Sequence, residues 1–208
     1  MKLLRHPDIQ EMISLDRNGF TSLIIENPVF YRQIRKELHD QALGEEGRFL
    51  FYDGEKEKPL TKSLTLVEDP LNFVIDEKKM NLLLQKDIAG HITVSQKEEY
   101  QLLLHQIGEY IRSISYDSPV AVSFDSEMTL ASFLKCMSVT ASETDGSFLE
   151  TILSQTRRIS IYLGINVFAF IGLEDLLTKE ELSYLSKRCG ARNVTSFSYL
   201  LMLRKTKS

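Results

Sequence analysis

The sequence predicts an α/β protein, and three observations support that prediction. Residues 21–38 and residues 163–182 each run from an apolar strand through a turn into a capped helix, which is the order of elements in a nucleotide-binding α/β core. Between them, the middle third of the chain has helical periodicity. We therefore expect an α/β head formed by residues 1–92 and 164–208, with an α-helical leg inserted at residues 93–163.

The head begins with a mixed segment, followed by a strand and a helix. Residues 1–17 suit either a strand or a short helix. Asn18-Gly19 is a turn signal that precedes a strand at residues 21–26. Asn27 is expected to cap the next helix because its side chain accepts backbone N–H groups, and the proline after it lacks the N–H that a first turn leaves unpaired.

Three further elements complete the first part of the head. Residues 47–54 predict a short strand, and the charged run at residues 55–59 predicts a solvated loop. Another strand is expected at residues 64–67. Asp76 then caps a helix that ends near Gly90.

The leg is expected to contain three helices. The capping box Ser95-x-x-Glu98 marks the first, a second opens near residues 125–126, and the capping box Ser147-x-x-Glu150 begins the third. The apolar side chains of the first helix form one stripe, which must pair within the leg or with another subunit. They are Tyr100, Leu103, Leu104, Ile107, Tyr110, Ile111 and Ile114.

The last part of the chain returns to the α/β pattern. Residues 165–171 are apolar on both faces, which is typical of a central strand in a parallel sheet. The capping box Thr178-x-x-Glu181 begins a helix. Residues 194–203 predict the last strand, and residues 204–207 a basic tail.

The composition is that of a soluble, folded protein. The 208 residues are 43% hydrophobic and 26% charged, and no apolar run approaches the roughly 20 residues that span a bilayer. The first residues have no secretory signal pattern, and two cysteines do not make a disulfide framework, so we expect a cytoplasmic protein. A net charge of −4 counts against a generic nucleic-acid binder, but an assembly can still gather lysines on one wall.

The sequence favours binding over catalysis. Its ten glycines form neither GxG nor GxxxxGK[ST], and the turn after the first strand of the core is Glu26-Asn27-Pro28. That turn lacks the glycine amides and the lysine that hold a polyphosphate. The histidines match no zinc spacing, and we expect each on the surface or in a loop: His6, His39, His91 and His105.

Three acidic residues are candidate metal ligands. Asp117, Asp125 and Glu127 lie in the hinge-like stretch entering and leaving the helical insert. Oxygen-rich loops of this kind suit calcium, which takes six to eight oxygen ligands in flexible geometry. The alternative is that Asp125 caps the helix that follows, and one carboxylate can serve both roles.

Three lysines form a local basic group. Lys62 precedes the strand at residues 64–67, while Lys78 and Lys79 lie in the first turn of the next helix. Positive charge at a helix N-terminus opposes the helix dipole, so these lysines hint at a function other than local stability. Ordinary solvated lysines are the alternative.

Three motifs follow one another in a characteristic order. TSLIIENPVFYRQI contains a strand, a Glu-Asn pair and a helix with Phe-Tyr in its first turn. LTKSLTLVEDPLNFVIDEKK contains a lysine, a strand, an Asp-Pro break and a polar helix start, and VFAFIGLEDLLTKEELSYL contains a buried strand and a Leu-Thr-x-x-Glu helix. In order and spacing, over about residues 20–203, they resemble the Csn-two family, the small accessory proteins of type II-A CRISPR systems.

This resemblance implies both a fold and a function. The family has a head related to phosphate-loop ATPases but lacking their loop, with a helical leg inserted through hinges. Its members form homotetrameric rings, bind calcium, and thread double-stranded DNA ends through a lysine-lined channel without hydrolysing nucleotide. They act with the CRISPR integrase and Cas9 during spacer acquisition. The residues here that match the family's lysines and acidic hinge are Lys62, Lys78, Lys79, Lys135, Asp125 and Glu127.

One departure from the family and two other functions are part of the expectation. Where the family carries several acids before the hinge, this chain has apolar and small residues at 119–123, so it either binds calcium less well than the family or uses different ligands. The first alternative function is a nucleotide hydrolase or nuclease on the same core. The second is a protein-interaction scaffold, which suits the acidic net charge.

Overall fold

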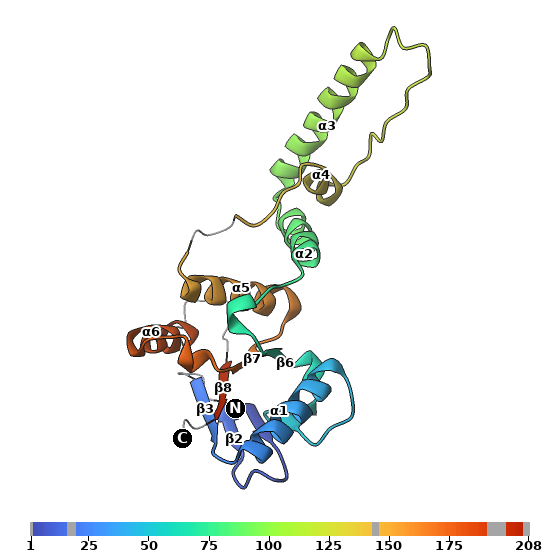
Figure 1. Cartoon of the computed structure of the whole chain (residues 1–208). Helices are drawn as coiled ribbons and strands as arrows, with labels where there is room; N and C mark the ends of the chain where they lie inside the picture. The colour runs from blue at the N-terminus through green and yellow to red at the C-terminus, as the bar shows by residue number, and fades with distance from the viewer. Residues whose placement is uncertain (1, 16–19, 143–145, 191–198, 206–208) are drawn as a thin grey trace. The chain divides into compact units, whose positions relative to one another are not determined.

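Figure 1 shows the computed structural model of the chain, which describes residues 2–15, 20–142, 146–190 and 199–205. The architecture is mixed α/β, as the sequence predicts. The chain divides into two compact units, which we call the head and the insert. The head comprises Met1–Ile75 and Thr144–Ser208, and the insert comprises Asp76–Glu143.

A parallel sheet of four strands lies at the centre of the head. Its order is β3 (Phe20–Ile25), β8 (Tyr199–Lys205), β7 (Val167–Ile171) and β6 (Leu64–Val67), and each neighbouring pair is parallel. All five residues of β7 are buried, which confirms the prediction of a central strand. Its odd-numbered residues belong to the main core cluster, so its phenylalanines at even positions lie on the opposite face.

The N-terminal segment forms strands of a second, antiparallel sheet. Its order is β2 (Ile13–Leu15), β1 (Lys2–Arg5), β4 (Leu50–Asp53) and β5 (Lys56–Lys58). The mixed start of the chain therefore forms two strands, because β1 finds partners on both sides. Of the two partners of β1, β2 is near in the sequence and β4 comes from far along the chain.

The prediction of a loop at residues 55–59 is wrong. Strand β5 occupies Lys56–Lys58, and Gly54 (φ 68°) with Glu55 forms the two-residue turn of a hairpin in which Asp53 is paired with Lys56. All three residues of β5 are exposed. Charged side chains suit such an edge strand because they oppose aggregation at an open sheet edge. In the sequence, the same charged residues resemble a solvated loop.

Helix α1 (Pro28–Leu43) packs against residues of both sheets in the core of the head. The Asn27 side chain accepts the N–H groups of Val29 and Phe30, as predicted, and Gly44 ends the helix in the left-handed conformation at φ 106°. The fully buried α1 residues Ile34 and Leu38 belong to one cluster with residues of both sheets. Burial of a side chain of this size contributes about 1.5–3 kcal/mol.

The other head helices are α5 (Phe148–Leu163) and α6 (Lys179–Gly190). Both predicted capping boxes are confirmed: Ser147 and Glu150 exchange side-chain-to-backbone hydrogen bonds, and so do Thr178 and Glu181. Three short 3₁₀ turns complete the head. They are η1 (Leu60–Lys62), η2 (Pro70–Asn72) and η3 (Leu173–Asp175).

The insert contains α2 (Glu77–Gly90), α3 (Val94–Ile114) and α4 (Leu130–Cys136). After α3 the chain returns alongside that helix to α4 (Figure 1). The Tyr100 hydroxyl donates to the Met128 carbonyl at 2.9 Å, and the Tyr100 and Phe133 rings lie 5.6 Å apart. These contacts join the base of α3 to α4.

Two predicted helix starts in the insert are wrong. The capping box of α3 is formed by Thr93 and Gln96, because Ser95 already lies inside the helix. Helix α4 begins at Leu130 rather than near residues 125–126, because Thr129 supplies the cap.

The units differ from the expected division at residues 92/93 and 163/164. Helix α2 belongs to the insert, where the buried Gln85 donates to the Val139 carbonyl at 2.8 Å, and α5 belongs to the head. Helix α5 buries Leu149, Ile152 and Ile159, so it serves as a core helix of the head. Helical periodicity alone does not say which neighbour covers a helix.

Some sequence predictions concern residues outside the described ranges. They are the Asn18-Gly19 turn, the beginning of the last strand before residue 199 and the end of the basic tail at residues 206–207. The first two residues of that tail, Arg204 and Lys205, belong to β8 instead. No helix in the described ranges has the length and apolar character needed to cross a membrane.

His6 corrects the expectation that every histidine is a surface or loop residue. It is fully buried at the end of β1, and its Nδ1 accepts the backbone N–H of Asp8, so its ring proton lies on Nε2. That Nε2 lies 2.8 Å from Glu37, which also accepts from Arg48 at 2.6 and 3.0 Å. The hydrogen bonds from Arg48, and next from His6, lower the pKa of Glu37 to about 2 against the opposing effect of partial burial.

We expect Glu37→Gln to lower the free energy of unfolding at pH 7 by about 1–2 kcal/mol, less than the full pKa shift because the site is partly exposed. The folded-state pKa lies below the unfolded value of 4.5, so this stabilisation is complete above about pH 4.5 and is lost as the pH falls toward about 2. Urea unfolding at pH 7 and pH 3 should show the variant and the wild type converging at low pH. The exposed Glu45→Gln serves as control, and a constant difference at both pH values would contradict the assignment.

Candidate nucleic-acid interface

Lys62 lies on the surface of the head between buried residues. It ends the turn η1, and its neighbours Leu60, Ser63 and Leu64 are all buried. The Lys62 side chain itself is exposed. Its backbone is therefore held in place while its ammonium group is free to reach a ligand.

Lys78 and Lys79 lie in the first turn of α2, as predicted, and both are exposed. The Asp76 carboxylate accepts the Lys79 backbone N–H at 3.1 Å and places negative charge at the helix start. The cost of two lysines at this position is thus partly offset by the cap.

Lys135 lies in the last turn of α4, where a positive charge is favourable to the helix dipole. It is exposed and belongs to the same unit as Lys78 and Lys79, whereas Lys62 belongs to the head. With the residues that the structure describes, none of these four lysines forms an ion pair.

Sequence reasoning missed Lys86, another exposed lysine of α2. It follows Lys79 by seven residues, so the two lie on the same face of the helix, two turns apart. The i, i+7 spacing of Lys79 and Lys86 in the sequence is the signal that could have identified it. With Lys78 nearby, α2 presents a short basic strip along its length.

The predicted metal ligands are exposed, and the structure gives one of them a local role. Asp125 accepts the Glu127 backbone N–H at 2.9 Å, which closes a turn before α4 rather than capping a helix. Asp117 lies on the returning segment after α3. Within the described ranges, no three His, Cys, Asp or Glu side chains gather closely enough to hold a metal ion.

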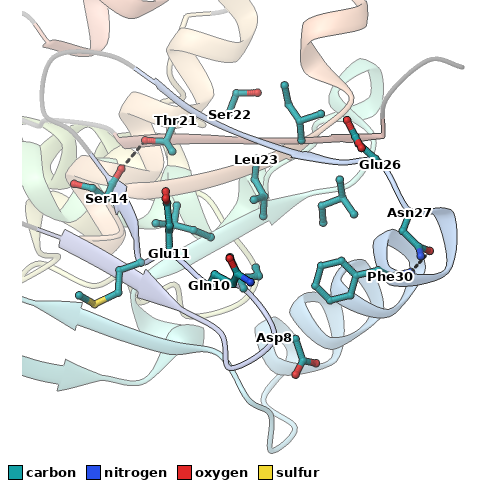
Figure 2. Close-up of a pocket in the computed structure, with 15 residues that line it drawn as sticks. Asp8, Gln10, Glu11, Ser14, Thr21, Ser22, Leu23, Glu26, Asn27 and Phe30 are labelled. Carbon is teal, nitrogen blue, oxygen red and sulfur yellow. Dashed lines mark hydrogen bonds between the residues drawn. The ribbon is translucent and has the colours of Figure 1, made fainter.

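The turn after β3 does not suit the phosphates of a nucleotide. The Asn27 side chain occupies the N–H groups of Val29 and Phe30, at 2.8 and 3.1 Å, and Pro28 has no N–H to offer. Glu26 adds a carboxylate directly beside them. A pocket of about 720 Å³ lies next to this turn, and Figure 2 shows its lining side chains.

The apolar stripe of α3 is covered on one side only. Tyr100 packs on Phe133, and Gly108 lies so close to Phe124 that an added Cβ would meet the ring at 3.0 Å. On the flank of the stripe away from Gly108, three apolar side chains are exposed, with the exposed fraction of each in parentheses: Leu103 (41%), Tyr110 (66%) and Ile114 (64%).

Comparisons with known proteins agree with this architecture. Residues 41–204 match a protein-family model described as CRISPR-associated protein (Cas_Csn2). The crystal structure of Stu0660 of Streptococcus thermophilus is similar in fold, with a TM-score of 0.53 and 9% sequence identity over 97% of this chain and 68% of that chain. No curated protein sequence matches the chain.

Proposed function

Because the chain belongs to the Cas_Csn2 family of CRISPR-associated proteins, we propose that it binds double-stranded DNA ends without sequence preference and without catalysing a reaction on them. In this proposal it acts as a homotetrameric ring in the cytoplasm and supports the acquisition of new CRISPR spacers. The CRISPR integrase and Cas9 are its expected protein partners. The observation that carries the DNA-binding part is a set of exposed lysines, unpaired with described residues, in a chain of net charge −4.

The proposed head is a relative of the phosphate-loop ATPases that has lost the nucleotide site. The support is the parallel sheet with a helix after β3, together with the turn at Glu26-Asn27-Pro28. Since the cap already uses the N–H groups of Val29 and Phe30 and Glu26 repels phosphate, this turn offers no amide cradle for a nucleotide phosphate. We therefore propose that the head takes part in DNA binding rather than in nucleotide hydrolysis.

The proposed DNA contacts are electrostatic. Lys62, Lys78, Lys79 and Lys135 would contact phosphate oxygens, which positions a duplex but does not read its bases. Lys86 extends this set along α2. One copy supplies few contacts, so we expect useful affinity only when several copies face the same duplex.

Self-assembly through α3 is the proposed route to such a ring. Leu103, Tyr110 and Ile114 expose apolar surface that a second copy can cover. Burying apolar area drives association, and large aromatic residues such as Tyr110 contribute most at interface centres.

Calcium is the proposed cofactor, held by Asp117, Asp125 and Glu127. The described part of one chain does not gather these carboxylates into a site, so carbonyl oxygens and groups of a neighbouring subunit would complete the six to eight ligands. The ion would then stabilise the assembled form. This role makes DNA binding and assembly sensitive to chelation.

A gel shift with linear and closed circular duplex of identical sequence tests the proposed function. We expect the linear duplex to bind and the closed circle to bind at least about tenfold less, because a closed ring loads only at a free end. Linearising the same circle should restore binding. Removal of calcium with EGTA, or the pair Asp125→Asn and Glu127→Gln, should reduce both binding and assembled mass.

Each arm of that experiment has an outcome that contradicts one part of the proposal. Equal binding of the closed circle would exclude threading onto an end, and an unchanged result in EGTA would exclude the calcium role. Shortening of the DNA over time would replace the proposal with a nuclease. Absence of any shift at low salt would favour a protein-interaction scaffold.

A further inference from the structure

Among the described residues, the outer edge of β3 has no paired strand. Strand β3 is the terminal strand of the parallel sheet, pairing with β8 on one side and with no described strand on the other. The pocket of about 720 Å³ lies along this edge, between β3 with its following turn and residues 8–14. We call this feature the β3 groove.

The lining pattern shows that the groove follows the strand edge rather than one face of the sheet. Consecutive residues from Thr21 to Asn27 line it, whereas a pocket over one face would meet every second side chain. The Thr21 hydroxyl donates to the Ser14 carbonyl at 2.7 Å near one end, and Phe30 of α1 lies near the other (Figure 2). Between these points the strand spans roughly 15–20 Å, enough for a short extended peptide.

The chemistry of the groove combines an apolar interior with an acidic rim. Leu23, Phe30 and Ile9 are partly buried side chains that pack against the head core. Glu11 and Glu26 are exposed on opposite walls, and neither forms an ion pair with a described residue (Figure 2). Asp8 also lines the groove, but Arg48 pairs with it at 2.8 Å.

We propose that the β3 groove binds an extended segment of a partner protein that carries lysine or arginine, and that this segment adds as a fifth strand at β3. An open strand edge offers unpaired backbone N–H and C=O groups, which give a peptide its affinity in this mode of recognition. The apolar interior takes alternate side chains, and the carboxylates of Glu11 and Glu26 select positive charge among the others.

The negative charge of the groove favours a basic peptide over a second copy of the chain or DNA. A second copy of the chain that paired through its own β3 groove would bring its Glu11 and Glu26 against the same carboxylates, and like charges placed opposite each other destabilise a strand pair. Phosphates of DNA would meet the same repulsion. The groove therefore adds a protein-recruiting surface to the proposed DNA-binding function, separate from the lysines of η1, α2 and α4.

The test uses the full-length protein and a fluorescein-labelled, acetylated peptide of alternating lysine and valine, six residues long. Anisotropy should show binding to the wild type and a loss of at least about tenfold in affinity for the pair Glu11→Lys and Glu26→Lys. The matched pair Glu45→Lys and Glu46→Lys makes the same change in net charge on an exposed loop of the head, and should leave affinity within about twofold. The same peptide with alternate backbone nitrogens methylated should also bind at least about tenfold more weakly, because it cannot form the strand hydrogen bonds.

Hydrogen exchange locates the bound peptide. Amide protection in residues 20–27 on addition of the peptide is expected, with no new protection in α2. Lack of binding to the wild type, equal binding of the methylated peptide, equal loss in both pairs of variants, or protection elsewhere would each overturn the proposal. A change in assembled mass in the Glu11/Glu26 pair alone would assign the groove to a second copy and also overturn it. Duplex binding should persist in that pair, so failure here is distinguishable from failure of the DNA-binding proposal.

Discussion

Raising the salt concentration from about 50 to 200 mM is expected to weaken binding of a duplex end by about 10³- to 10⁵-fold, if the assembly makes six to ten phosphate contacts. The physical reason is the release of counterions when ammonium groups neutralise phosphates. Each contact contributes about −0.9 to the slope of log K against log salt. Fluorescence anisotropy with a labelled blunt duplex measures this slope directly.

The charge-reversal pair Lys78→Glu and Lys79→Glu should reduce both the affinity and the slope. Each subunit loses up to two contacts, and the new carboxylates repel phosphate, so we expect a loss of at least about 100-fold at low salt. The matched control is Lys36→Glu with Lys56→Glu, exposed residues of the head with the same change in net charge. A flat salt dependence, a preference for particular sequences or an equal loss in the control would contradict phosphate contacts by α2.

The second large effect concerns the uncovered face of α3. The pair Tyr110→Lys and Ile114→Lys should convert the assembly to smaller species, since each side chain forfeits about 1.5–3 kcal/mol of burial at every interface that it joins. The dissociation constant should rise by at least about 100-fold. Sedimentation velocity across a concentration series measures the change.

The control for that prediction lies on the same helix. Gln101 and His105 are exposed and lie on the side of α3 away from Tyr110, so Gln101→Lys with His105→Lys adds the same charges without removing apolar surface. Its assembled mass should equal that of the wild type. An unchanged mass for the Tyr110/Ile114 pair would show that this face is not the interface. Duplex binding should fall together with assembly, because one copy supplies few lysines.

Elements with local signals were predictable. The cap at Asn27, the capping boxes at Ser147 and Thr178 and the buried strand β7 follow from side chains within a few residues of each element. Strand β5 was missed because its three charged residues look like a loop until β4 is placed beside them. Helix α5 was assigned to the wrong unit because an amphipathic helix shows that it has a partner, not which partner.

The candidate site also has features that the sequence predicts and features that it does not. The lack of a phosphate loop and the exposure of Lys62, Lys78, Lys79 and Lys135 could be predicted from residue types and helix starts. The buried His6 could not, because its polar atoms are satisfied by Glu37 and Asp8, the first from a distant part of the chain. The hydrogen bond that the Glu127 backbone N–H donates to the Asp125 carboxylate likewise depends on how the chain turns before α4.

By itself, the sequence determined the α/β class, the helix caps at Asn27, Ser147 and Thr178, the lack of a GxxxxGK[ST] motif and the family resemblance, since each depends on neighbouring residues and their spacing. Only the tertiary structure decided the strand orders β2-β1-β4-β5 and β3-β8-β7-β6, the open edge of β3 and the half-covered face of α3. The reason is physical. Strand pairing and the burial of a face are long-range contacts between segments that local propensity does not connect.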